Sequence, residues 1–272
     1  MSSTDLRSRV RKMLQADNSL KEKLITGLSE LLGTGILVFL GCMGCVGGLT
    51  PISPTHLQIT LNFGLSVMMV IQIFGHISHA HVNPSITVGA VVLGKKTILE
   101  GIIYILSQSV GAILGYGMLK IVTPHGSLKG SATAPLEQFC VTKLADNVSV
   151  TQGLLIESIA TAVLMLIACA IWDKKNEKNT DGVSLKFGLA VTALATAAGP
   201  YTGCSMNPAR SLAPAIWNNQ WSRHWVYWFG PMGGSMLAAL LYRTIFQTKE
   251  YTCEEETMPE TVVLNSIESE KN

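Results

Sequence analysis

The chain has 272 residues, of which 48% are hydrophobic and only 14% are charged, and its formal net charge is +2. Soluble domains carry about 25% charged residues, so this composition excludes an ordinary soluble protein. The small net charge gives no indication of a nucleic-acid partner, and none is expected. Charges are also clustered, because residues 31–94 contain no Asp, Glu, Lys or Arg. The composition therefore predicts a membrane protein.

Six stretches are apolar enough to cross a bilayer, whose ~30 Å hydrocarbon core needs ~20 helical residues. They lie at about residues 24–46, 57–76, 98–121, 151–172, 184–201 and 224–246. The first 23 residues hold six Lys and Arg residues and no long apolar run, so we expect no cleavable signal peptide and a cytosolic basic segment at 1–23. Six spans return the chain to the cytosol, where the acidic tail at 248–272 is expected to be disordered.

The distribution of basic residues supports this orientation. It puts 15 of the 20 Lys and Arg residues on the cytosolic side, which is the bias of multi-pass membrane proteins. The other side receives only Lys120, Lys129, Lys143, Arg210 and Arg223. We expect a plasma-membrane protein with both termini in the cytosol.

An internal repeat relates the two halves of the chain. Phe63 begins FGLSVMMV and Phe187 begins FGLAVTAL, and an Asn-Pro-small triplet follows each phenylalanine by 20 residues. Both landmarks are offset by 124 residues. Because each copy contains three spans, the second copy must enter the membrane from the opposite side. Inverted repeats of this kind predict a site at the interface between the two copies.

The two triplets are Asn83-Pro84-Ser85 and Asn207-Pro208-Ala209. Asn is a preferred helix N-cap and Pro suits the first helical position, so each triplet predicts the start of a helix. About ten residues follow each, too few to cross a bilayer, so both half-helices must re-enter and stop at mid-membrane. We expect the Asn amide oxygens to cap backbone N–H groups and the NH2 groups to stay free for a permeating molecule. The positive helix ends would repel cations.

These features resemble the major intrinsic protein family over about residues 22–247. The resemblance rests on SELLGTGILVFLG, GHISHAHVNPSITVG, SQSVGA, IESIATAVL, TGCSMNPARS and HWVYWFGP, and is strongest to the insect entomoglyceroporins. It implies an all-α membrane protein with six transmembrane helices and two re-entrant half-helices. The channel domain would be 24–247, with repeats at about 24–121 and 151–247. It also implies a homotetramer in the lipid bilayer with one pore per subunit. Ser85 departs from the usual alanine.

In this family four positions form a narrow outer constriction, and the matching residues here are Phe63, Ala195, Cys204 and Arg210. Members that pass only water have histidine at the position of Ala195. A methyl group there widens the constriction and leaves an apolar wall facing the Arg210 donors, which suits a polyol. We expect a passive channel for glycerol, other small uncharged solutes such as urea, and water, which excludes ions and protons. The short loop after NPARS and the Tyr227-Trp228 pair are typical of water channels, so a water-selective channel stays an alternative.

Two intramembrane carboxylates, Glu30 and Glu157, lie in the first predicted span of each half. By resemblance, each accepts hydrogen bonds from backbone N–H groups of a re-entrant loop and acts as a structural anchor. An ion-coupled secondary transporter, the alternative of another class, normally has more membrane carboxylates or polar ion sites than these two. The chain shows no catalytic motif, so neither enzymatic activity nor a cofactor is expected.

Three further patterns complete the expectations. Asn147-Val148-Ser149 is a glycosylation sequon in a loop predicted to be extracellular. His76, His79 and His81 could suggest a metal site, but a role in the loop before the first half-helix is favoured and no metal is expected. The cysteines, at 42, 45, 140, 169, 204 and 253, are scattered, so no disulfide framework is expected, and Cys42 and Cys45 are interpreted as packing residues.

Overall fold

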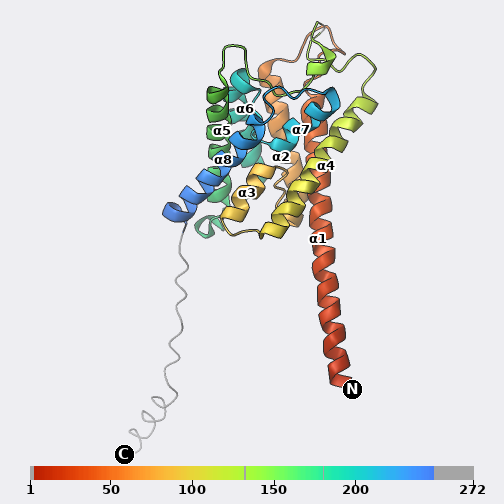
Figure 1. Cartoon of the computed structure of the whole chain (residues 1–272), viewed down its shortest axis with the longest axis vertical. Helices are drawn as coiled ribbons and strands as arrows, with labels where there is room; N and C mark the ends of the chain where they lie inside the picture. The colour runs from red at the N-terminus through yellow and green to blue at the C-terminus, as the bar shows by residue number, and fades with distance from the viewer. Residues whose placement is uncertain (1–2, 132, 180, 248–272) are drawn as a thin grey trace, which may run out of the picture.

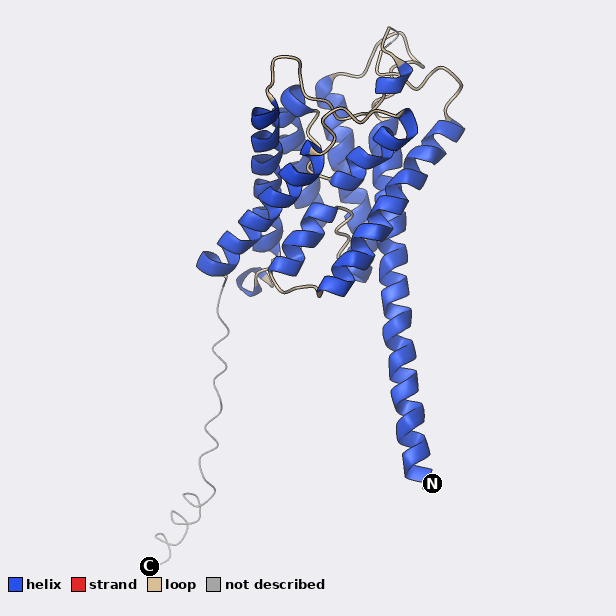
Figure 2. Ribbon diagram, in the orientation of Figure 1, coloured by secondary structure: helices blue, strands red, loops and turns tan. Residues whose placement is uncertain are grey.

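The computed structural model describes residues 3–131, 133–179 and 181–247; side chains are described from residue 20 onward, and the predicted tail at 248–272 lies outside the described residues. The described chain is helical and contains no strand (Figures 1 and 2). The α-helices are α1 (Ser3–Met43), α2 (His56–Ser78), α3 (Pro84–Val92), α4 (Ile98–Val122), α5 (Val150–Ile171), α6 (Val183–Thr202), α7 (Pro208–Asn218) and α8 (Val226–Leu241). Short 3-10 turns, η1 (Leu136–Gln138) and η2 (Lys174–Asn176), interrupt two loops, and a π-turn, η3 (Tyr242–Phe246), follows α8.

Five of the described helices are long and apolar enough to cross a membrane. They are the Leu20–Met43 part of α1 and the whole of α2, α4, α5 and α6. The sixth predicted span, 224–246, is divided between α8, which has 16 residues, and the five-residue turn η3. The chain stays helical from Val226 to Phe246, which preserves the length that a crossing needs. The described part of the basic segment predicted at 1–23 forms the beginning of α1, and in Figure 1 this end of α1 extends away from the bundle.

The starts of three long helices follow from local sequence. Thr55, Thr97 and Ser149 each accept a hydrogen bond from the backbone N–H of the third residue of α2, α4 and α5. The Gln or Glu side chain at that third position accepts the N–H of the cap residue in return, which completes a capping box. Such boxes satisfy N–H groups that would otherwise lack partners at the membrane surface. The helix boundaries therefore lie within a few residues of the predicted ones.

The packing shows the inverted repeat. Within each half, α1 packs on α4 and α5 packs on α8. Between the halves, α2 packs on α6, α3 on α8 and α7 on α4. In Figure 1, α3 lies in the lower part of the bundle and α7 in the upper part, so the two half-helices approach its middle from opposite ends. The half-helices have 9 and 11 residues, close to the predicted ten.

Two glycines, Gly64 of α2 and Gly188 of α6, form a seam at which the two halves of the chain are in contact. A Cβ atom on Gly64 of α2 would clash with the backbone oxygen of Gly188 and with the Thr192 side chain, and one on Gly188 would lie 2.8 Å from the Gly64 oxygen. Gly64 and Gly188 are separated by the repeat offset of 124 residues. The absence of side chains at both positions is what lets α2 and α6 touch backbone to backbone. Beside the seam, the Thr60 and Thr196 hydroxyls are hydrogen-bonded at 2.8 Å.

The expectation that no disulfide is present is wrong. Cys42, near the end of α1, is bonded to Cys140, and their Cα atoms are 5.8 Å apart. The two cysteines are 98 residues apart in sequence, and the loop between α4 and α5 brings Cys140 back over the end of α1. Cys45 keeps the predicted packing role, since it is a buried free thiol.

Candidate functional site

The loops that lead into the two half-helices have the same backbone shape. His79, Ala80 and Val82 have positive φ angles of 69°, 44° and 43°. Their counterparts 124 residues later, Gly203, Cys204 and Met206, have φ angles of 75°, 42° and 51°. Five of these six residues are not glycine, so the left-handed conformation is costly and needs support from surrounding groups.

Glu30 and Glu157 provide that support. Both are fully buried. The Glu30 carboxylate accepts hydrogen bonds from the backbone N–H groups of His81 at 3.0 Å and Val82 at 2.8 Å, and from the Ser78 hydroxyl at 2.6 Å.

Glu157 repeats this arrangement in the second half. It accepts from the backbone N–H groups of Ser205 and Met206, both at 2.9 Å, and from the Thr202 hydroxyl at 2.6 Å. Gln108 breaks the symmetry, because it donates to Glu30 at 2.7 Å and has no counterpart among the partners of Glu157. The predicted contacts of the two carboxylates with the re-entrant loops are thus present in the structure.

Asn83 and Asn207 cap α3 and α7. The Asn83 amide oxygen accepts from the Ser85 N–H at 2.8 Å, and the Asn207 oxygen accepts from the Ala209 and Arg210 N–H groups at 3.1 and 3.2 Å. Pro84 and Pro208 occupy the first helical turns, as predicted.

The expectation that both NH2 groups stay free is wrong in part. Asn83 donates one hydrogen bond to the Met206 oxygen, and Asn207 donates one to the Val82 oxygen, both at 2.8 Å. The inverted repeat explains this exchange, because it brings the two loops into contact at the middle of the bundle. An amide NH2 has two N–H bonds, so each asparagine keeps one for a ligand.

An outer cavity of about 190 Å³ lies between α2, α6 and the loop before α7. All four residues predicted for the constriction, Phe63, Ala195, Cys204 and Arg210, line it. Of the predicted Asn-Pro residues, Asn83 and Asn207 also line it, so the structure brings the predicted filter residues and the two asparagines to one cavity. By contrast Ser85 and Ala209 are fully buried behind the asparagines.

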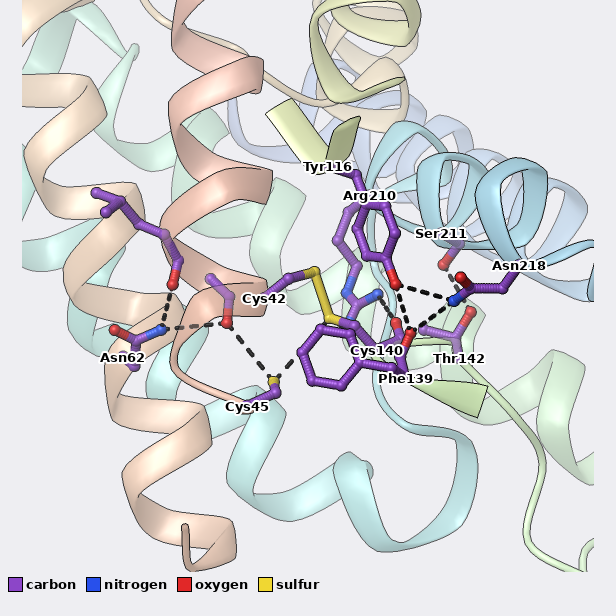
Figure 3. Close-up of a disulfide and its surroundings, with 12 residues drawn as sticks. Cys42, Cys45, Asn62, Tyr116, Phe139, Cys140, Thr142, Arg210, Ser211 and Asn218 are labelled. Carbon is purple, nitrogen blue, oxygen red and sulfur yellow. Dashed lines mark hydrogen bonds between the residues drawn. A yellow bond between two sulfur atoms is a disulfide. The ribbon is translucent and has the colours of Figure 1, made fainter. Parts of the chain in front are cut away.

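Arg210 has defined partners at this cavity. Its Nη1 donates to the Cys140 backbone oxygen at 2.8 Å (Figure 3). Its guanidinium carbon lies 4.8 Å from the centre of the Phe63 ring. The residue is only 8% exposed, so its buried charge depends on these contacts. Guanidinium carries five N–H donors, and those without a protein acceptor among the described residues are available to a solute.

The inner half contains a smaller cavity and has a basic mouth. A cavity of about 50 Å³ shares Val67, Asn83, Leu164 and Val191 with the outer one. It continues, past His79, His81 and Trp172, into an opening that Lys95 and Lys96 also line. The three cavities thus follow one another through the bundle. His76 belongs to the last turn of α2 and not to the loop, and no group of three or more His, Cys, Asp or Glu side chains among the described residues is placed to hold a metal ion.

Sequence reasoning missed three residues at this path. His56, at the first position of α2, lines the outer cavity, and its Nε2 lies 3.0 Å from the Thr196 oxygen. Trp172 lines the inner cavity, where its ring centre lies 5.4 Å from that of His81. Cys140 holds Arg210 through its backbone. Cys140 could have been suspected of forming a disulfide, because it lies in a loop predicted to be extracellular, where disulfides persist.

A model of the major intrinsic protein family matches residues 18–242. The chain belongs to this family. Other members of the major intrinsic protein family are similar over most of the chain. Aquaporin-4 of Mus musculus is 38% identical over 221 residues, 80% of this chain and 66% of its own length. Aquaporin-2 of Bos taurus is 35% identical over 218 residues, 80% of this chain and 77% of its own length. The chain therefore spans just under two thirds of the mouse aquaporin-4 sequence.

A solved structure shows the same fold. It is the X-ray structure of the aquaglyceroporin from Plasmodium falciparum, with a TM-score of 0.69, covering 82% of this chain and 96% of that one. The sequences are 22% identical, so this likeness concerns the fold alone. Together with the apolar helices, membership of the major intrinsic protein family identifies a multi-pass membrane protein.

Proposed function

We propose that this protein is a passive channel for glycerol, other small uncharged solutes including urea, and water. The observation that carries the proposal is Ala195, a small side chain in the wall of the outer cavity that also contains Phe63 and Arg210. Phe63 and Ala195 offer an apolar side, and Arg210 offers hydrogen-bond donors. A polyol has CH groups on one edge and hydroxyl oxygens on the other, so it can contact both sides as it loses water.

Exclusion of ions and protons is supported by the centre of the path. The N-termini of α3 and α7 meet beside Asn83 and Asn207, and each helix end carries about half a positive charge. A cation would meet two positive ends and N–H donors in place of its hydration shell, whereas a hydroxyl or water oxygen is a suitable acceptor. Neither an enzymatic step nor a cofactor is part of this proposal.

A water-selective channel is the second candidate, and His56 is the observation that favours it. Its imidazole lines the outer cavity next to Gly199, one helical turn from Ala195 along α6. A histidine supplied by α2 would narrow the entrance from a different position than the one that the family comparison predicts. The glycerol-to-water permeability ratio separates the two candidates.

The test is a swelling assay on vesicles that contain the purified full chain, with separate water and glycerol gradients. The proposed channel shortens both relaxation times relative to empty vesicles. Fast water flux with glycerol flux at the level of empty vesicles would identify the water-selective candidate. Flux that saturates and follows an ion gradient would instead indicate the secondary transporter.

We further propose a plasma-membrane location with both termini in the cytosol. The ends of the described chain, at the start of α1 and the end of η3, lie toward the same side of the bundle in Figure 1. The Cys42–Cys140 bond supports an extracellular position for the opposite side, because disulfides persist in oxidising compartments.

Asn147 lies on that same side, is exposed, and stands two residues before Ser149, the N-cap of α5. We propose that it carries a glycan. A mobility shift on glycosidase treatment, absent in Asn147→Gln, tests both the modification and the orientation.

The domain limits and the assembly are also proposals. Residues 24–247 form the channel domain, with repeats at 24–121 and 151–247, preceded by the cytosolic segment 1–23. Large apolar side chains are exposed on the long helices, such as Leu61 on α2, Leu106 on α4 and Leu237 on α8, which suits contact with lipid and with neighbouring subunits. We propose a homotetramer with one pore per subunit, which cross-linking in native membranes would test.

A further inference from the structure

The Cys42–Cys140 disulfide lies next to Arg210, the arginine predicted for the constriction. Cys140 accepts a hydrogen bond from Arg210 Nη1 at its backbone oxygen, at 2.8 Å, and its Sγ lies 3.6 Å from Arg210 Nη2. The same sulfur is bonded to Cys42 at the end of α1. Figure 3 shows this chain of contacts from α1, through the disulfide, to the guanidinium. One residue therefore connects a cross-link to the narrow part of the path.

The backbone of Cys140 is in a conformation that needs a restraint. Its φ angle is 58°, in the left-handed region that non-glycine residues disfavour. Rotation about φ moves the carbonyl oxygen, so a return to negative φ would turn the Arg210 acceptor away.

The neighbours of Cys140 are fixed by hydrogen bonds. The Phe139 oxygen accepts from the Tyr116 hydroxyl and from Asn218 Nδ2, both at 3.0 Å, and the Thr142 hydroxyl donates to Ser211 at 2.8 Å. These contacts hold the segment 139–142 on α4 and α7 whatever the state of the sulfur. Loss of the disulfide would consequently act on the orientation of Cys140, while the loop stays docked.

We propose that the Cys42–Cys140 disulfide positions Arg210 and thereby sets the selectivity of the pore, so that reduction of this bond loosens the filter. The inference rests on the proposed channel function. Cys140 is a positioning residue here, since it acts through Arg210. With the bond intact, the fork of N–H donors is fixed beside Phe63. With the bond broken, the guanidinium loses its oriented acceptor and the passage admits larger solutes more readily.

The chemical step is ordinary thiol–disulfide exchange with a small external dithiol. One thiolate of the dithiol attacks the Sγ of Cys140, because residue Cys140 is partly exposed whereas Cys42 is fully buried. The Cys42–Cys140 bond breaks and Cys42 leaves as a thiolate. The second sulfur of the dithiol then attacks its own sulfur in the mixed disulfide and releases Cys140. The dithiol is oxidised to a cyclic disulfide, and Cys42 and Cys140 take up the two protons.

Cys45 supplies a matched control. Its Sγ lies 4.0 Å from Cys140 Sγ and donates to the Gly41 oxygen at 3.6 Å, but it is not part of the disulfide. Cys45→Ser removes a sulfur atom beside Cys140 Sγ and leaves the Cys42–Cys140 disulfide intact. Because a free Cys45 could pair with Cys140 once Cys42 is absent, the variant without the cross-link should be the double substitution Cys42→Ser/Cys45→Ser.

The experiment uses the full chain in vesicles, measured before and after treatment with dithiothreitol, with free thiols counted by mass spectrometry. We expect reduction to raise the glycerol-to-water permeability ratio by at least about threefold, a change typical of mutations in coupled networks. Cys45→Ser should respond as the unmodified chain does. The double variant should show the raised ratio without reductant and should not respond to it.

Two results would overturn the inference. One is an unchanged ratio in protein whose Cys42 and Cys140 are demonstrably reduced. The other is an equal loss of water and glycerol flux, which would mean that the bond only maintains the fold. Reduction of folded protein in the vesicle avoids dependence on variants that fail to fold. If the oxidised protein passes neither solute, the proposed channel function itself fails. This result differs from flux that persists with an unchanged glycerol-to-water permeability ratio, which overturns only the role of the disulfide.

Discussion

Asn83 and Asn207 each donate a hydrogen bond to the carbonyl oxygen of the residue that precedes the other, Met206 and Val82 respectively. The two bonds have the same length, 2.8 Å, and are related by the inverted repeat. Each asparagine is therefore at once a helix cap, a link between the halves and, through its remaining N–H, a donor to the path. These three roles can be separated by substitution.

Asn207→Ser and Asn207→Ala separate capping from linking. Serine is a good N-cap, but its hydroxyl does not reproduce both the cap and the reach to the Val82 oxygen, whereas alanine can do neither. We expect Asn207→Ala to lower the free energy of unfolding by about 1 kcal/mol more than Asn207→Ser. Thermal unfolding in detergent measures the difference, and equal stabilities of the two variants would argue against a capping role.

Glu157→Gln tests the anchoring of the second loop. The carboxylate accepts from the Ser205 and Met206 N–H groups and from Thr202, and an amide would present an NH2 to one of these donors. Losing one hydrogen bond to a charged group costs about 1.5–3 kcal/mol. We expect a lower unfolding temperature and reduced water flux per molecule. Glu137→Gln, at an exposed position of η1, is the control. Unaltered folding and flux in Glu157→Gln would refute the anchoring role.

Ala195→His tests the substrate proposal. The imidazole would occupy part of the outer cavity, so glycerol permeability should fall by about tenfold, the effect of roughly 1.4 kcal/mol on the barrier, while water permeability changes less. Ala195→Ser keeps the small side chain and serves as the control. Vesicle swelling with each solute gives both values. Equal glycerol flux through both variants would show that Ala195 does not set the width.

Cys204→Ser tests the position of a thiol in the cavity wall. Cys204 lines the outer cavity, and its Sγ donates to the Leu194 oxygen at 3.6 Å. A thiol reagent attached there would obstruct the path, so we expect block of flux in the unmodified chain and resistance in Cys204→Ser. Cys169→Ser removes a buried thiol of the core on α5 and should stay sensitive. A Cys204→Ser protein that remained equally sensitive would contradict this placement.

The central part of the molecule was predictable because its sequence is repeated. The offset of 124 residues between Asn83 and Asn207 predicts two half-helices from opposite sides, and α3 and α7 have about the expected length. The carboxylate contacts of Glu30 followed from resemblance to the family. What no local pattern indicated was the exchange of hydrogen bonds between the loops, since it depends on how closely the two copies approach.

The loop between α4 and α5 shows a second limit of prediction from the sequence. Cys42 lies in an apolar helix and Cys140 lies in a loop without periodicity, so spacing alone gives no reason to pair them. The left-handed Cys140 and its contact with Arg210 likewise depend on tertiary packing. His56 was missed for a similar reason, because a residue at the start of a span reads as a surface residue until α6 is placed beside it.

The glycine seam restricts how the protein can move. Gly64 and Gly188 let the backbones of α2 and α6 come into direct contact, and the Thr60–Thr196 and asparagine hydrogen bonds hold the two halves together near this contact. A carrier that alternately opens to each side must rock one half against the other and would have to break all of these contacts in every cycle. The seam therefore favours a path that is open to both sides at once over one that opens to each side in turn.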